Sequence, residues 1–437
     1  MQKTELELFI PPEKQGTYYT LPFTMPEDVD EFQLSYHYLS YREESHTVDG
    51  GRFTSRQQVN IIDLGLIGPD GRQVGVSGSN KESITLSANR ATPGYTPRPL
   101  TPGRWEILIG AYKVAPEGVT VRYTLTFMPK TRRLFIGDPH THTVASDGIL
   151  TIEALAAHAR NHGLDFLAIT DHNQMSISTI LNRIPGITLI PGVEWTHYQG
   201  HANFLGVDQP YDEPFYANNE EEVKDRFQSA RERGATIVIN HPADPGCGFH
   251  FDLNQLPFDC IEIWNGPMRE SNLQAVGMWQ AMLEAGRKIP AVGGSDYHKD
   301  NLFQIVGSPC MGVYAKSNQP ADLLRAIRAG HSFIRFAPQG PSLEMKFGDA
   351  IMGDTVQWEQ DQPLQIDAQG LQKDDVLRVV HNQESTDLFQ APSNGDCNLT
   401  YPISRPGFVR VEIYRTFLPG IPPLLVLISN PIYFEEG

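Results

Sequence analysis

The sequence predicts an α/β barrel that is flanked by two β-rich domains. The chain has 437 residues, which is more than one hydrophobic core normally organises, so two or three domains are expected. Strand and helix patterns alternate over residues 131–337, and this alternation is typical of an α/β barrel. Short strands separated by turn residues dominate residues 1–130 and 338–437, and they predict two β domains.

The N-terminal region, residues 1–130, is expected to be a β-sandwich or a jelly roll. Polar and apolar residues alternate at 121–127, which is typical of a half-buried strand. Glycine and proline form a turn signal at 68–71. Several short strands with such turns pack as two sheets. We expect this region to support a catalytic domain, and sugar binding is the alternative role.

The middle region, residues 131–337, alternates strands with helices. Residues 151–159 carry apolar side chains at helical spacing, with Thr151 as a cap and Gly163 as a stop. About seven strands over this length favour an α/β barrel over an open sheet. The expected strands are 134–136, 166–169, 187–193, 202–206, 236–239, 261–264 and 291–292, and further helices are expected at 220–233, 272–285 and 321–329.

The C-terminal region, residues 338–437, is expected to be a small β domain that supports the barrel. Its apolar runs at 364–368, 376–380, 408–414 and 425–428 predict strands. None of these strands carries a cluster of catalytic residue types.

Composition narrows the classes of partner. The formal net charge is −17, which argues against nucleic acid, because phosphate backbones are bound through Lys and Arg. A small anionic substrate stays possible, because bound cations invert the local field. The four cysteines form no Cys-x-x-Cys pair, so free buried thiols are expected. An acidic N-terminus and the lack of an 18-residue apolar run predict a cytoplasmic protein without a membrane partner.

Side chains that bind metals follow the expected strands one after another. His140 and His142 lie two apart at a strand end, so both imidazoles point to the same face. Residues at the C-terminal ends of parallel barrel strands meet at one rim. Histidine and carboxylate together suit Zn, Mn or Fe. The pattern continues at later strand ends with Asp147, Asp171, His172, Glu194, His201, His241, Asn265, Asp296 and His298.

This region resembles the PHP family, the polymerase-and-histidinol-phosphatase superfamily of metal-dependent hydrolases. The string 262–266 and the flanking β regions look most like its carbaryl-hydrolase-type (CehA/McbA) branch. The resemblance is carried by the residues at 140–143, 146–148, 169–173, 192–194, 200–203, 240–242, 262–266 and 293–298.

The resemblance implies a distorted (β/α)7 barrel with two to three divalent transition metals, Zn, Mn or Fe, at the strand ends. Some relatives have histidine where Asp147 stands, so the third site here is richer in oxygen and favours Mn or Fe. His197 is an alternative to His201, because only a short loop separates His201 from Glu194. In the implied ligand set, metal one takes His140, His142, Glu194 and Asp296; metal two takes Glu194, His201 and His241; metal three takes Asp147, His172 and His298.

The resemblance also implies a hydrolase that uses metal-bound hydroxide at a di- or trinuclear site. A phosphoesterase acting on small phosphomonoesters or phosphodiesters is the main expectation. A carbamate, ester or amide hydrolase is the alternative, and an apolar pocket lined by Trp195, Trp264 or Phe249 would favour it. A non-catalytic binding protein with a relic metal site is the third hypothesis.

Catalytic and substrate-binding roles follow from position. Asp296 or His298 is expected to pass a proton to the leaving group, and Asn265 to orient water or substrate. Arg269 and Lys299 come just after two ligand strings and are expected to bind a substrate anion, with solvated surface charge as the alternative. The sequence does not indicate the oligomeric state.

Overall fold

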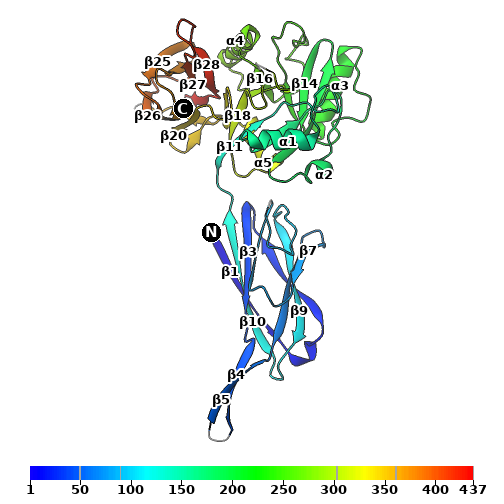
Figure 1. The fold of residues 1–437 in the computed structure, drawn as a ribbon. Helices are drawn as coiled ribbons and strands as arrows, with labels where there is room; N and C mark the ends of the chain where they lie inside the picture. The colour runs from blue at the N-terminus through cyan, green and yellow to red at the C-terminus, as the bar shows by residue number, and fades with distance from the viewer. Residues whose placement is uncertain (49–50, 89, 302–303, 360–361, 437) are drawn as a thin grey trace. The chain divides into compact units, whose positions relative to one another are not determined.

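The computed structural model describes residues 1–48, 51–88, 90–301, 304–359 and 362–436. The chain divides into two compact units, Met1–Thr131 and Arg132–Gly437. Figure 1 shows that the first is built of strands and that the long helices belong to the second. The second unit holds both the expected barrel and the C-terminal strands, so the further division at residue 337 stays a prediction.

Two four-stranded antiparallel sheets, β1-β10-β3-β8 and β2-β9-β6-β7, make up most of the first unit. Their buried faces share one apolar core that contains Phe32, Trp105 and Tyr123. β4 and β5 form a separate hairpin. The strands are β1 (Gln2–Ile10), β2 (Tyr18–Met25), β3 (Val29–His37), β4 (Tyr41–Val48), β5 (Gly51–Gln58), β6 (Ile61–Ile67), β7 (Gln73–Ser77), β8 (Ser83–Ser87), β9 (Gly103–Lys113) and β10 (Val119–Pro129), with a 3-10 turn η1 at Pro12–Lys14.

The second unit contains one large mixed sheet in the order β17-β16-β15-β14-β13-β12-β11-β18-β19, which continues into the C-terminal strands. β11, β12 and β13 are parallel, as are β15, β16 and β17. β14 is antiparallel to both of its neighbours. These strands are β11 (Arg133–Asp138), β12 (Phe166–Ile169), β13 (Thr188–His197), β14 (Gly200–Leu205), β15 (Thr236–Ile239), β16 (Cys260–Asn265), β17 (Ala291–Gly294), β18 (Cys310–Ala315) and β19 (Ser332–Arg335).

The reversed direction of β14 corrects the expectation of a fully parallel barrel. Its register with β13 pairs His197 with Gly200, which leaves Tyr198 and Gln199 as a two-residue turn. So short a turn can join only antiparallel strands. His201 consequently lies at the beginning of its strand, next to the end of β13, and still reaches the same rim as Glu194.

Five helices accompany this sheet in the described residues, and four of them match the expected positions. The side chain of Thr151 caps α1 by accepting a hydrogen bond from the N–H of Ala154 (3.3 Å), as the sequence predicts. No helix in the described part of the chain is long and apolar enough to cross a membrane. The helices are α1 (Ile152–Asn161), α2 (Ser178–Leu181), α3 (Glu220–Glu232), α4 (Glu270–Glu284) and α5 (Pro320–Arg328).

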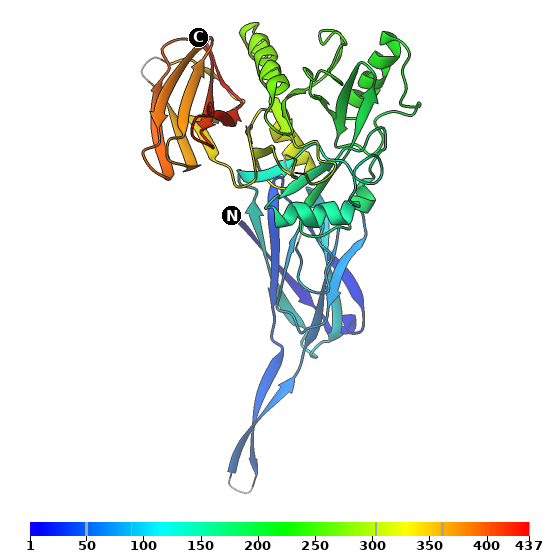
Figure 2. The same ribbon diagram turned by 45° about the horizontal axis from the view of Figure 1, so that its top comes forward.

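The C-terminal strands join the large sheet because β19 pairs with β28. Figure 2 shows these strands as the part of the chain coloured from yellow-orange to red. Asn430 links them to the other strands: its side chain bonds the backbone of Ala291 at the start of β17 and that of Ser332 in β19. The strands are β20 (Ser342–Phe347), β21 (Ala350–Ile351), β22 (Thr355–Gln357), β23 (Pro363–Leu371), β24 (Val376–His381), β25 (Glu384–Gln390), β26 (Gly395–Pro402), β27 (Gly407–Arg415), β28 (Leu424–Ser429) and β29 (Ile432–Glu435).

Candidate metal centre

The ends of β11 and β17 meet through Asp138, the last residue of β11. Its fully buried carboxylate accepts hydrogen bonds from the backbone N–H and the hydroxyl of Ser295, and from the N–H of Gly307. Burial raises the pKa of Asp138 to about 6, and these hydrogen bonds oppose the rise. Asp138 also accepts from the N–H of His140. This carboxylate therefore holds together the two strand ends that carry His140 and Asp296.

Four side chains form the first cluster of ligand types, namely His140, His142, Glu194 and Asp296. The Nε2 atom of His140 lies 3.4 Å from Glu194 and 3.3 Å from Asp296. The Nε2 atom of His142 lies 3.3 Å from Glu194 and 2.9 Å from Asp296. This is the set expected for metal one.

The polar atoms at the centre of this cluster fit a cation. His140 Nε2, His142 Nε2, Glu194 Oε2 and Asp296 Oδ1 are all buried, and none has a partner in hydrogen-bond geometry. Unpartnered buried polar atoms are costly, and most are paired in folded proteins. Two imidazole nitrogens and two carboxylate oxygens that converge without proper hydrogen bonds are a suitable donor set for a divalent transition metal.

A second cluster lies around the Oε1 atom of Glu194, which His140 Nε2 also approaches, at 3.4 Å. Glu194 Oε1 is 3.1 Å from His201 Nδ1 and 3.3 Å from His241 Nε2, and it accepts a hydrogen bond from the side chain of Asn240 (2.8 Å). Because its two oxygens face different histidines, Glu194 can bridge two cations. His197 does not take part: its ring contacts the backbone of Ala217 and Gln199.

The third cluster contains Asp147, His172, His298 and again His142. Asp147 lies 3.2 Å from His298 Nε2, 3.7 Å from His172 Nε2 and 3.9 Å from His142 Nδ1. The side chain of Asp147 is 58% exposed, whereas that of Glu194 is fully buried. The centre is therefore open to solvent at Asp147 and closed at Glu194.

Electrostatic coupling within the cluster is strong. Burial by itself raises the pKa of Glu194, but neighbouring histidines, above all His140, outweigh burial and hold it well below the usual range. Burial lowers the pKa of His140, but Asp296, Glu262 and Glu194 outweigh it, so the net shift is well upward. The carboxylate of Glu194 is thus kept ionised, as a metal ligand must be, and a cation bound here would displace the proton from His140.

Strained backbone marks three positions of this centre. Asn173, His241 and Asp296 adopt positive φ angles of 52°, 26° and 50°, a region that residues other than glycine rarely occupy. Two of them are expected ligands, and Asn173 follows the ligand His172. Such strain persists only where surrounding contacts over-determine the conformation.

The remaining expected residues lie around the clusters. Asn265 donates to Glu262 (3.1 Å) and to Asp296 (3.3 Å). Arg269 is half exposed, donates to Asn265 (3.1 Å) and pairs with Asp244 (3.1 Å). Lys299 is exposed directly after His298. Of the two expected anion-binding residues, Arg269 is therefore the one connected to the metal centre.

Asp171 acts as a brace for the loop that follows His142. It accepts hydrogen bonds from the N–H and hydroxyl of Thr143 (2.7 and 2.8 Å) and from the hydroxyl of Ser146 (2.8 Å). Since Asp147 follows Ser146, these bonds help to hold the third cluster in place.

Sequence reasoning missed two residues at this centre, Glu262 and Cys247. Glu262 lies 3.0 Å from the Nδ1 atom of His140. The Sγ atom of Cys247 lies 3.5 Å from the Nδ1 atom of His241 and 3.4 Å from Asp244. Two signals were available in the sequence: a carboxylate inside an otherwise apolar strand, and a cysteine six residues after His241 of the Asn-His-Pro string.

Residues 138–327 match the PHP domain family. This match covers less than half of the 437-residue chain. Together with the histidine and carboxylate clusters, the match supports a metal-binding domain over these residues. The carbaryl-hydrolase-type branch is not confirmed and stays a prediction.

Two curated relatives share part of this sequence. The 5'-3' exoribonuclease Rnm of Escherichia coli is 37% identical over 117 residues, and that of Salmonella typhimurium is 35% identical over 114. Each alignment covers 24% of this chain, and it covers 40% and 39% of the respective relative. The chain thus matches well under half of either relative.

Solved structures of similar proteins include a two-domain Bacteroides vulgatus protein that contains a predicted PHP-like metal-dependent phosphoesterase. It is 18% identical, with a TM-score of 0.42, and the match covers 68% of this chain and 95% of that one.

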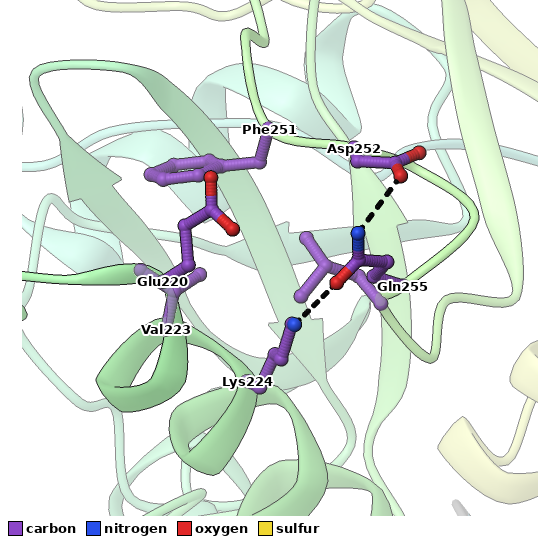
Figure 3. Close-up of a pocket in the computed structure, with 7 residues that line it drawn as sticks. Glu220, Val223, Lys224, Phe251, Asp252 and Gln255 are labelled. Atoms are coloured by element: carbon purple, nitrogen blue, oxygen red, sulfur yellow. Dashed lines mark hydrogen bonds between the residues drawn. The ribbon is translucent and has the colours of Figure 1, made fainter.

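A small pocket separate from these clusters lies between α3 and the segment before β16 (Figure 3). Its lining includes Val223, Phe251 and Leu256. Lys224 donates to Gln255, whose amide donates to Asp252 (3.1 Å). Glu220 and Asp252 also line the pocket, so its carboxylates outnumber its one lysine and do not favour an anion.

Proposed function

We propose that this protein is a phosphoesterase that acts on small phosphomonoesters or phosphodiesters at a di- or trinuclear metal centre. The observation that carries the proposal is the set of buried, unpartnered donor atoms on His140, His142, Glu194 and Asp296, with the other expected ligands in overlapping groups beside it. The implied ligand set described above assigns these clusters to metals one, two and three. The identity and number of the metals belong to this proposal.

A divalent cation in such a site acidifies a coordinated water and stabilises charge on phosphoryl oxygens. The protein contributes the remaining steps. Glu194 holds the first two clusters together, and Asp171 and Asp138 fix the segments that carry the ligands. In this proposal Asp296 or His298 passes a proton to the leaving group. Arg269, which contacts Asp244 and Asn265, is proposed to bind a substrate anion.

The distorted (β/α)7 barrel is proposed with the function. Two contacts support closure of the ring from β17 back to β11. One is the link from Asp138 to Ser295, and the other is a parallel bridge between Thr141 and Tyr297. The β-sandwich of residues 1–130 and the β domain of residues 338–437 are proposed as its flanking parts.

No described contact favours the carbamate or ester alternative. Trp195, Trp264 and Phe249 are buried in the hydrophobic core, at 0%, 2% and 7% exposure. They therefore do not line an open aromatic pocket. Nucleic acid was not expected from the charge of the chain, but the names of the curated relatives make a phosphodiester of RNA a substrate to be tested.

The proposal is tested with purified protein loaded with Mn²⁺, Zn²⁺ or Fe²⁺. The panel contains an aryl phosphomonoester, an aryl phosphodiester, a 5′-phosphorylated oligoribonucleotide, an aryl carbamate and an aryl acetate. We expect metal-dependent cleavage of at least one phosphoester, loss of that activity in His140→Ala, and its retention in the control His250→Ala, an exposed histidine outside the clusters. Cleavage of the carbamate or acetate alone, or an active His140→Ala protein, would contradict the proposal.

A further inference from the structure

Glu262 is a buried carboxylate whose two oxygens serve different parts of the metal centre. It lies in β16 and is 2% exposed. Its Oε1 atom is 3.0 Å from the Nδ1 atom of His140. Its Oε2 atom accepts hydrogen bonds from the backbone N–H of His241 (2.9 Å) and from the side chain of Asn265 (3.1 Å).

This arrangement is not an ordinary buried ion pair. Within the described residues, the only ionisable side chain paired with Glu262 is His140, and no Lys or Arg takes part. A buried carboxylate is costly unless hydrogen bonds satisfy it. Here these bonds come from an expected ligand of metal one, the backbone of an expected ligand of metal two, and the amide of Asn265. The position of Glu262 is explained by the centre it supports.

We propose that Glu262 is a positioning residue that sets both metal sites at once; this inference rests on the proposed function. At His140, a proton on Nδ1 is donated to Oε1, which leaves the Nε2 lone pair directed at Glu194 and Asp296. A carboxylate behind a metal-binding histidine fixes its tautomer and ring orientation in this way. At His241, the backbone N–H donates a hydrogen bond to Oε2, which holds the residue at its φ of 26°.

Glutamine in place of Glu262 keeps the shape but cannot make the same contacts. An amide has one accepting oxygen and a donating nitrogen, whereas His140, His241 and Asn265 all offer donors here. If the oxygen faces His241, the NH₂ group faces His140 and favours the tautomer with its proton on Nε2. That tautomer has no free lone pair for the cation. If the oxygen faces His140 instead, the NH₂ group opposes the N–H of His241.

The experiment compares Glu262→Gln and Glu262→Asp with the wild type and with the control Glu412→Gln. Glu412 is also a buried carboxylate, but it pairs with Arg410 and Tyr414 outside the metal clusters. Zn²⁺ and Co²⁺ affinities are measured by competition with a chelator, bound metal is counted, and the visible absorption of the Co²⁺ protein is recorded. Circular dichroism of the metal-free proteins checks that each variant folds.

We expect about 10- to 100-fold weaker metal affinity in Glu262→Gln, the range found for supporting residues of metal ligands, with an altered Co²⁺ spectrum. Glu262→Asp keeps the charge, but its shorter side chain cannot reach both partners, so it should weaken affinity as well. Glu412→Gln should leave affinity and spectrum unchanged. In a phosphoesterase assay, kcat should fall more than KM rises.

Wild-type metal affinity and a wild-type Co²⁺ spectrum in a folded Glu262→Gln protein would overturn the inference. Wild-type metal affinity in Glu262→Asp would overturn it too, because only the negative charge would then be needed. If Glu262→Gln does not fold, Glu262→Asp decides by the same measurements. A wild-type protein that binds metal but cleaves no phosphoester would contradict the proposed function only, because the affinity comparison does not depend on turnover.

Discussion

The two units of this chain bury different kinds of side chain. Among the described residues of the first unit, the buried polar side chains are Asn60, Ser77 and Thr126, and its core is otherwise apolar and aromatic. The second unit buries His140, His142, Glu194 and Glu262 close together. A core of the first kind is complete when the chain has folded. The second contains donor atoms that a cation would complete, so its stability should depend on metal.

Glu194→Gln, in the second unit, is expected to have the largest effect, which is a loss of activity. Glu194 faces five histidines of the clusters, and a neutral amide cannot bridge two cations as a carboxylate does. Because the cations supply several kcal/mol of transition-state stabilisation, phosphoesterase activity should fall by about 10³-fold or more. Initial rates at matched metal loading measure this. Activity within about tenfold of the wild type would break the assignment of Glu194 as the bridge.

Trp105→Ala is expected to cause a large loss of stability that is confined to the first unit. Trp105 is fully buried, and its indole N–H donates to the carbonyl of Thr101 (2.9 Å). Removing a buried tryptophan costs about 3–5 kcal/mol of stability. Hydrogen exchange followed by mass spectrometry should show faster exchange in residues 1–131, while bound metal stays at the wild-type amount. Loss of metal in this variant would show that the two units are not independent in stability.

Metal removal should destabilise the second unit and leave the first unchanged, the reverse of the pattern expected for Trp105→Ala. At a free metal concentration of 100 times Kd, binding stabilises the folded state by about 2.7 kcal/mol per site. A chelator should therefore speed exchange around β11, β13 and β16 and leave the strands of the first unit unchanged. Equal changes in both units, or none in either, would contradict the comparison.

The smallest effect is expected from Cys247→Ala. Its thiol contacts His241 and Asp244, but a thiol is a weak hydrogen-bond partner. We expect about tenfold weaker metal affinity or less, at the low end for residues that support metal ligands. The matched control is Cys397→Ala, a free cysteine in β26. A loss as large as that of Glu262→Gln would mean that Cys247 itself binds metal.

Much of this organisation could be predicted from sequence because the signals are local. Apolar runs placed β12, β15 and β16, and the Thr151 cap placed α1. The expected ligands follow strand ends, and the structure brings them into four overlapping groups, in one of which His201 and His241 lie with Cys247. Their assignment to particular metals, like the roles of Arg269 and Lys299, stays a proposal.

The features that could not be predicted depend on contacts between distant segments. Glu262 lies inside a buried strand. Its role depends on its contact with His140, which follows β11 and precedes Glu262 by 122 residues in the sequence. Cys247 reaches His241 only because the intervening loop folds back. The direction of β14 did have a local signal in its two-residue turn, and the expectation of parallel strands overrode it.

The pairing of β19 with β28 also has a consequence for synthesis of the chain. Asn430 bonds to Ser332 across 98 residues, and ribosomes add about 5–20 residues per second. For about 5–20 s, therefore, β19 has emerged without β28, the partner strand that covers its edge. An uncovered edge strand is a template for pairing with other chains. We expect nascent chains that end between these two strands to need a chaperone, and the requirement to end when residue 430 has left the exit tunnel.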